Sequence, residues 1–295
     1  MVKTLKQMDL QPGDLLEESN QRQLIEKEVD EAQQVIKLLD RGLLLATAVD
    51  TWESQGIWIV GWSDQDYPEI FRERLKGQAP PLLYGLGEKA LLAEGGLAII
   101  GSRNVDEEGI LFTRKAAHSC ASHGVQVISG GARGVDREAM STCLDNGWSV
   151  IGVLADSLAR YAVSSEIRDA VIDGALVLIS QVEPEAHFHV GNAMARNKLI
   201  YSLADFALVI SSEFNKGGTW AGATDNLKKR WVPLFVRSGD NVPEGNLRLL
   251  ESDGIAIDED AFEHNDIVGW MQEKIATRST PDAEAISGSQ WVLPL

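Results

Sequence analysis

The chain has 295 residues, which is enough for one large domain and one small one. Hydrophobic residues make up 44% of it and charged residues 24%, as in globular proteins, and no apolar run is long enough to cross a bilayer. The formal net charge of -17 disfavours a surface that is basic overall, and no apolar signal core begins the sequence, so we expect a cytoplasmic protein.

The acidic charge is unevenly distributed along the chain. Residues 97–250 carry 17 acidic and 15 basic side chains, whereas residues 251–295 carry ten acidic and two basic ones. Because binding responds to the local field, the middle segment can still hold an anion. The two cysteines, Cys120 and Cys143, favour neither a disulfide framework nor a metal site, and we expect no metal and no cofactor.

The first part of the chain predicts a small, mostly helical domain over residues 1–90. Apolar residues recur every three or four positions between residues 15 and 50, which indicates helices. Two short strands follow, one at 57–61 and one ending at Gly85, after a Pro80-Pro81 pair that stiffens the chain. This mixed segment precedes a clear change of pattern near Leu97.

From Leu97 onward, short apolar runs alternate with helical stretches. Continuous apolar strands of this kind predict an α/β domain over residues 91–258, with a Rossmann-like, doubly wound and mostly parallel sheet covered on both faces. Residues 259–295 then read as an acidic tail, with a linker at 277–290 and an apolar end, 291–295, that docks on its own chain or on a protein partner. The expected strands are Leu97–Gly101, Val125–Ser129, Trp148–Leu154, Ala175–Ser180, Phe206–Ser211 and Val232–Val236.

Glycine-rich turns follow three of these strands, and each opens a helix. Gly101-Ser102-Arg103 is the first, residues 129–136 (SGGARGVD) form the second, and residues 216–219 (KGGT) form the third. Free backbone N–H groups in such turns form a nest for phosphate, and an arginine can add two parallel hydrogen bonds. Parallel strands end at one edge of the sheet, so the three turns predict one phosphate site.

A fourth motif, residues 195–198 (ARNK), lies near the start of a helix. It places two cationic side chains, Arg196 and Lys198, on either side of the Asn197 side-chain amide. Asp136 is expected to cap the helix after the second turn. His187 and His189 lack a third metal ligand, so we expect no metal site there. The residues predicted to bind phosphate or nucleic acid are Gly101, Ser102, Arg103, Ser129, Gly130, Gly131, Ala132, Arg133, Gly134, Arg196, Asn197, Lys198, Lys216, Gly217, Gly218 and Thr219.

In this order and spacing, GSR, SGGARGVD and ARNKLI resemble the signatures of the DprA/Smf family of DNA-processing proteins. The resemblance spans about residues 57–257 and implies a Rossmann-like domain that binds single-stranded DNA without strong sequence preference. It further implies a homodimer or higher homo-oligomer, loading of a recombinase of the RecA type, and a role in DNA processing, recombination or defence against foreign DNA. The sequence shows no C-terminal winged helix of that family.

The chain also departs from the family pattern. Met140 stands where the family has a histidine, Ala162 where it has a proline, and Ala193 where it has an aromatic residue, for which Phe188 is a candidate substitute. A sensor of a nucleotide or nucleotide-derived signal, using the same pocket, is therefore the alternative. A third hypothesis is a hydrolase of nucleotide N-glycosidic bonds with Glu138 or Glu213 as its carboxylate, although no catalytic pattern is present and we assign no catalytic residue.

Overall fold

The computed structural model describes residues 2–27, 32–39, 41–264 and 266–279. They form two compact units, Met1–Gln55 and Gly56–Leu295. This division differs from the predicted boundary at residue 90. The two strands expected in the small domain instead extend the large sheet, because β2 (Leu82–Leu86) pairs antiparallel with β6 (Leu176–Ser180).

The N-terminal unit is helical, as its apolar spacing predicts, with a 3-10 helix between the first two α-helices. Its small core holds the buried side chains Leu5, Leu15, Leu24 and Ala32. The α-helices are α1 (Val2–Gln7), α2 (Glu18–Glu26), α3 (Ala32–Leu39) and α4 (Gly42–Ser54).

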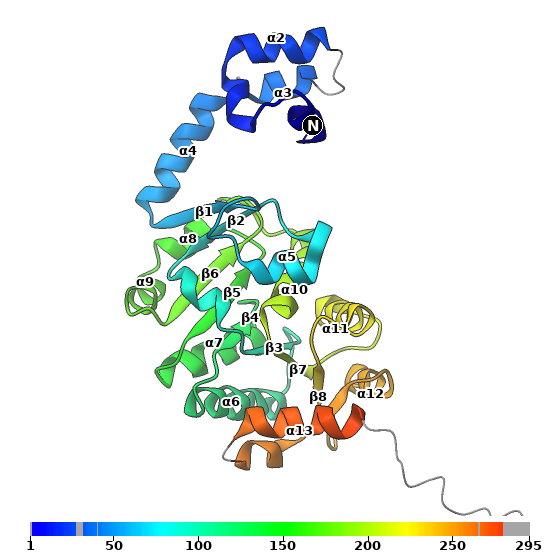
Figure 1. The fold of residues 1–295 in the computed structure, drawn as a ribbon. Coiled ribbons are helices and arrows are strands. Elements are labelled where there is room, and N and C mark those ends of the chain that lie inside the picture. The colour runs from blue at the N-terminus through cyan, green and yellow to red at the C-terminus, as the bar shows by residue number, and fades with distance from the viewer. Residues whose placement is uncertain (1, 28–31, 40, 265, 280–295) are drawn as a thin grey trace, which may run out of the picture. The chain divides into compact units, whose positions relative to one another are not determined.

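The second unit contains a nine-stranded sheet in the order β1-β2-β6-β5-β4-β3-β7-β8-β9, drawn in Figure 1. Strands β3 to β9 run parallel to one another, whereas β2 pairs antiparallel with both β1 and β6. The predicted Rossmann-like, mostly parallel sheet is thereby confirmed. The remaining strands are β1 (Ile57–Gly61), β3 (Leu97–Gly101), β4 (Val127–Ser129), β5 (Val150–Leu154), β7 (Phe206–Ser211), β8 (Leu234–Arg237) and β9 (Ile255–Ile257).

Helices cover both faces of the central strands. Helices α6 and α7 pack together on one face, and α10 packs with α5 and α11 on the other (Figure 1). No described helix is both long and apolar enough to cross a bilayer. The helices of this unit are α5 (Glu69–Leu75), α6 (Glu107–Ser122), α7 (Val135–Asp145), α8 (Leu158–Ala162), α9 (Ser165–Ile172), α10 (Val190–Leu203), α11 (Gly217–Lys229), α12 (Glu244–Glu251) and α13 (Ile267–Ser279).

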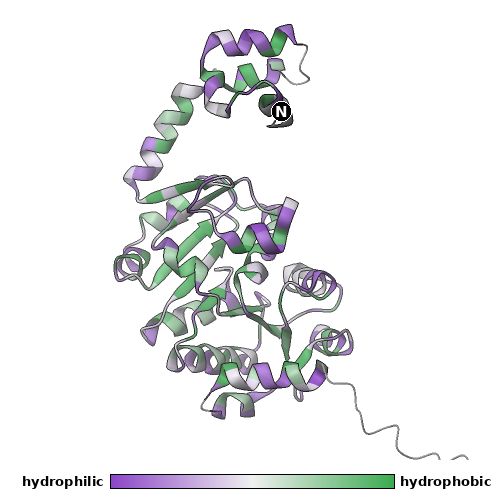
Figure 2. Cartoon of the chain, viewed as in Figure 1, coloured by the Kyte–Doolittle hydropathy of each residue, from purple (hydrophilic) through white to green (hydrophobic). Residues whose placement is uncertain are grey.

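The central strands are hydrophobic along their whole length, because each of their faces meets a layer of helices. Every residue of β5, β6 and β7 is buried. Figure 2 colours these strands as hydrophobic, whereas the helices alternate between hydrophobic and hydrophilic residues. The strands can therefore be predicted from their continuous apolar composition, and the helices from the periodic spacing of their apolar residues.

The acidic segment predicted as a tail is partly folded. A 3-10 helix at Glu259–Glu263 and α13 follow the last strand, and their side chains Ala261, Ile267 and Met271 are buried. The ring of Phe262 meets Phe112 of α6 edge to face at 5.1 Å, which anchors the segment. Residues 259–279 of the predicted tail therefore contain helical structure. The rest of it, including the apolar end at 291–295, lies outside the described residues.

Candidate functional site

The three predicted glycine turns lie near the point where the order of strand addition reverses. From β3 the chain adds β4, β5 and β6 on one side, and later β7, β8 and β9 on the other. The loops after β3, β4 and β7 are therefore neighbours at the carboxyl edge, which is where such sheets bind ligands. The backbone N–H of Ser102 donates to the carbonyl of Ser211 at 2.9 Å and closes the gap between two of these loops.

The glycine loop after β4, residues 130–134, depends on its glycines for its shape. Gly134 has φ +88° and ψ -132°, a conformation that is essentially restricted to glycine. A Cβ there would lie 2.5 Å from the carbonyl oxygen of Ser102. At Gly101, a Cβ would lie 2.5 Å from a methyl group of Val135. The absent side chains thus allow the first two turns to pack directly against each other.

Replacing Gly134 with alanine is expected to lower the free energy of unfolding by about 2 kcal/mol, because it combines backbone strain with a clash against Ser102. Gly147→Ala is the matched control, since Gly147 also has positive φ, +75°, but open space around its Cβ position. Urea denaturation of the two variants measures the difference. Equal losses would contradict the close approach of the loops.

Asp136 lies inside the first turn of α7 rather than at its cap, so the predicted capping role is wrong. Gly134 occupies the cap position, and the Asp136 side chain points into the protein, where it is 4% exposed. Burial raises the pKa of its carboxyl group. Arg196 and the backbone N–H groups of Gly101, Ala132 and Gly130 act in the opposite direction. The carboxylate therefore faces Arg196 and the backbone of the first two turns.

Arg196, on α10, brings a buried guanidinium to the glycine loop. It is 6% exposed, and its Nη2 lies 3.8 Å from an oxygen of Asp136. A Cβ on Gly130 would lie 1.7 Å from its Nη1, so this glycine makes room for the arginine. Burial lowers the pKa of Arg196 most, Asp136 raises it, and the nearby Arg103 lowers it again. Among the described residues, its Nε finds no hydrogen-bond partner.

Arg103 and Arg133 supply exposed positive charge at the same edge. The Arg103 guanidinium lies 4.9 Å from the ring centroid of Phe188, which is 48% exposed. Arg133 donates from Nη2 to the side-chain oxygen of Asn104 at 3.0 Å. The two arginines thus come from the first and second turns, and a solvent-facing aromatic ring lies beside one of them.

Two predicted serines use their hydroxyl groups within the protein. The Ser129 hydroxyl is buried and donates to the carbonyl of Ile99 at 2.7 Å, so it joins β4 to β3. The Ser102 hydroxyl accepts a hydrogen bond from the backbone N–H of Asn104 at 3.1 Å. Only the backbone of Ser129 lies at the loop. The predicted residues Gly131 and Ala132 complete the loop and are half-buried.

The other predicted polar side chains are also engaged within the chain. Asn197 donates to the carbonyl of Gly218 at 2.9 Å and fixes the start of α11. Lys198 donates to the carbonyl of Gln78, and burial lowers its pKa. Lys216 is exposed and pairs with Glu213 at 2.9 Å. The third turn, which continues through Gly217 and Thr219, therefore contributes backbone groups rather than a free cation.

The carboxylates considered for glycosidic cleavage are both surface groups in ion pairs. Glu138 pairs with Arg114, and Glu213 pairs with Lys216. His189 accepts a hydrogen bond from the backbone N–H of Gly191 at 3.0 Å and caps α10. No group of three or more histidine, cysteine or acidic side chains among the described residues is arranged to hold a metal ion. The features that this edge brings together are thus the glycine turns and the guanidinium groups of Arg103, Arg133 and Arg196.

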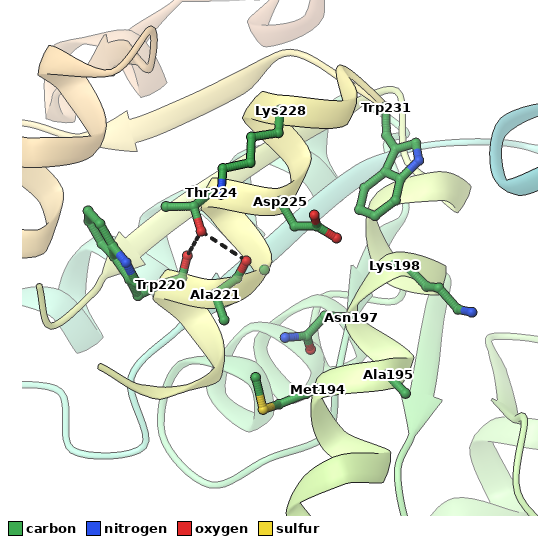
Figure 3. A pocket seen from close by; sticks show the side chains of 11 residues that line it. Met194, Ala195, Asn197, Lys198, Trp220, Ala221, Thr224, Asp225, Lys228 and Trp231 are labelled. Carbon is green, nitrogen blue, oxygen red and sulfur yellow. Dashed lines mark hydrogen bonds between the residues drawn. The ribbon is translucent and has the colours of Figure 1, made fainter. Parts of the chain in front are cut away.

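The sequence interpretation overlooked a groove between α10 and α11, beside the third turn. Figure 3 shows Met194 and Asn197 on one side and Asp225 and Trp231 on the other. The groove has a volume of about 470 Å³. Trp220 lies on α11 and Trp231 lies just after its end, and neither position marks a groove in the sequence.

Known proteins are similar to this chain in sequence. The family model for DNA recombination-mediator protein A matches residues 58–257. The protein Smf of Synechocystis sp. is 30% identical over 195 residues, which are 64% of this chain and 48% of Smf. DNA processing protein DprA of Bacillus subtilis is 24% identical over 225 residues, which are 74% of this chain and 75% of that protein. The chain spans about half the length of Smf and of several other curated relatives.

Solved structures of DprA proteins have the same fold. The crystal structure of DprA from Streptococcus pneumoniae superposes with a TM-score of 0.67 at 19% identity, covering 87% of both chains. DNA processing protein A from Helicobacter pylori gives a TM-score of 0.57 at 23% identity, covering 75% of this chain and 96% of that one. Because the family match extends over more than half of the sequence, the chain belongs to the DNA recombination-mediator protein A family, also known as DprA/Smf.

Proposed function

We propose that this chain binds single-stranded DNA through its phosphates at the carboxyl edge of the sheet. In this role it acts in DNA processing, recombination or defence against foreign DNA, and makes no covalent change. Family membership supports the proposal, as does the Helicobacter pylori relative, whose structure was described for its single-stranded DNA binding mode. The negative charge of the whole chain is no obstacle, because residues 97–250 are nearly balanced.

The buried guanidinium of Arg196 is the observation that carries this proposal. It faces the glycine loop, lies near a second guanidinium, that of Arg103, and has only a loose pairing with Asp136. An anion between the two arginines would relieve their repulsion and accept hydrogen bonds that the protein itself does not satisfy. The backbone N–H groups of the loop suit the same anion. A phosphate of a nucleic acid meets these requirements.

Phe188 supports a single strand rather than a duplex as the ligand. Its exposed ring is held beside Arg103, at the point where a base next to the bound phosphate could stack. Stacking on an aromatic ring needs an unpaired base and tolerates any sequence, because every base has a π-face. The ring also stands in for the aromatic residue that the sequence lacks at Ala193.

Arg103→Ala tests the proposal at an exposed residue whose loss leaves the core intact. We expect the affinity for a fluorescent oligonucleotide to fall about tenfold at low salt. The slope of the logarithm of the affinity against the logarithm of the salt concentration should shrink in magnitude by about one. Fluorescence anisotropy across a salt series measures both quantities. Arg168→Ala, an exposed change of equal charge on α9, is the control and should have little effect. A wild-type protein that binds no oligonucleotide at low salt would refute the proposal.

A nucleotide-sensing role remains the second candidate, because a glycine nest with two arginines suits one phosphate group as well as a polymer. Thermal-shift measurements with nucleotides and oligonucleotides separate the two ligands. Stabilisation by oligonucleotides alone supports the DNA proposal, and stabilisation by a nucleotide alone supports the sensor. We also propose a homodimer or higher homo-oligomer, as the family resemblance implies, which sedimentation equilibrium would measure.

A further inference from the structure

The groove between α10 and α11 opens directly beside the proposed phosphate site. Asn197, which follows Arg196 in α10, lines the groove and ties it to the third turn through Gly218. Small residues, Ala221 and Gly222, face α10 and keep the space open. The volume of about 470 Å³ falls in the range of small-ligand sites. A strand held at Arg196 would therefore pass the mouth of this groove.

The far end of the groove has the chemistry of a base-binding site. Trp231 lines it and is braced by Tyr201, with ring centroids 6.4 Å apart and planes at 29°. Figure 3 shows the Asp225 side chain projecting into the space beside the Trp231 ring. Asp225 is exposed, and within the described chain its carboxylate forms no hydrogen bond or ion pair, so its oxygens can accept. Lys198 and Lys228 on the rim offset its charge.

We propose that this groove holds one unstacked base of the bound strand and that Asp225 discriminates against thymine. This inference rests on the proposed binding of single-stranded DNA. A carboxylate only accepts hydrogen bonds, so it favours bases that present an amino group, as cytosine does at N4. Thymine presents O4 at that position, and its lone pairs would face the negative charge. The indole of Trp231 provides a stacking surface that any base can use.

Two variants test the groove with oligo(dC) and oligo(dT) of equal length, both flexible pyrimidine strands. We expect the wild type to bind oligo(dC) about fivefold more tightly than oligo(dT). Asp225→Asn should bring that ratio close to one, since an amide can also donate to thymine O4. Ala221→Phe, which fills the groove, should weaken binding of oligo(dC) about tenfold, as expected for the loss of one stacked base.

The ratio of the two affinities separates base selection from the general effect of charge. Asp145→Asn removes an equal charge at an exposed position of α7 and should leave the ratio unchanged. If the wild type binds both strands but the ratio is one, or if Asp225→Asn does not alter it, the groove proposal is overturned while DNA binding stands. If the wild type binds neither strand, the proposed function itself fails.

Discussion

Replacing Asp136 with alanine is expected to lower the free energy of unfolding by about 3–5 kcal/mol, because it leaves a buried charge without its counter-charge. Asp136 and Arg196 are both almost fully buried, and Asp136 is the only carboxylate among the described residues that forms an ion pair with that guanidinium. The substitution also removes the negative group that faces the backbone N–H groups of Gly130 and Ala132. Urea denaturation with linear extrapolation measures the loss.

Controls for this prediction lie on the same two helices. Asp145→Ala, at the exposed end of α7, should change stability by about 0.5 kcal/mol or less. Adding Arg196→Met to Asp136→Ala should recover part of the loss, because the unpaired charge is then gone. Two single losses that simply add in the double variant would show that the pair is not coupled.

The carboxyl-edge location of the glycine turns could be predicted from the sequence, because parallel strands buried on both faces are continuous apolar runs. The strand Leu97–Gly101, for example, is observed with the predicted bounds. The glycine turns after such strands must then lie at one edge, whatever the details of packing. This part of the prediction needed only local composition and one topological rule.

Contacts between distant segments could not be predicted in this way. The pairing of Leu86 with Leu178 joins β2 to the large sheet across 92 positions, and no periodicity in either segment signals the partner. Asp136 has the local pattern of a helix cap. Its actual position depends on Gly134, which occupies the cap and so begins α7 two residues earlier than a cap at Asp136 would. Lys198, a predicted phosphate ligand, also donates a hydrogen bond to the carbonyl of Gln78, 120 residues away, which the sequence did not signal. In each case tertiary packing decided between roles that the local sequence allows equally.

The burial of Arg196 could not be predicted from the sequence either. Replacing this residue is expected to have the largest effect on binding. Replacing Arg196 with methionine should weaken the affinity for single-stranded DNA by about 2–3 kcal/mol, or roughly 100-fold. A desolvated guanidinium forms stronger hydrogen bonds to phosphate than an exposed one, and Met keeps much of the volume. Arg103, which is exposed, should contribute less because solvent screens it.

Arg196→Lys separates charge from geometry in the same site. Lysine retains a positive group for Asp136, so the fold should be less perturbed than by methionine, but it lacks the planar fork that binds two phosphate oxygens at once. We therefore expect Arg196→Lys to lose most of the affinity that Arg196→Met loses, while its urea midpoint stays closer to that of the wild type. Anisotropy titrations and urea denaturation on the same preparations give both quantities. If both variants bind oligonucleotide as tightly as the wild type, the phosphate lies elsewhere along the edge, and Arg196 serves only to hold the glycine loop in place through Asp136.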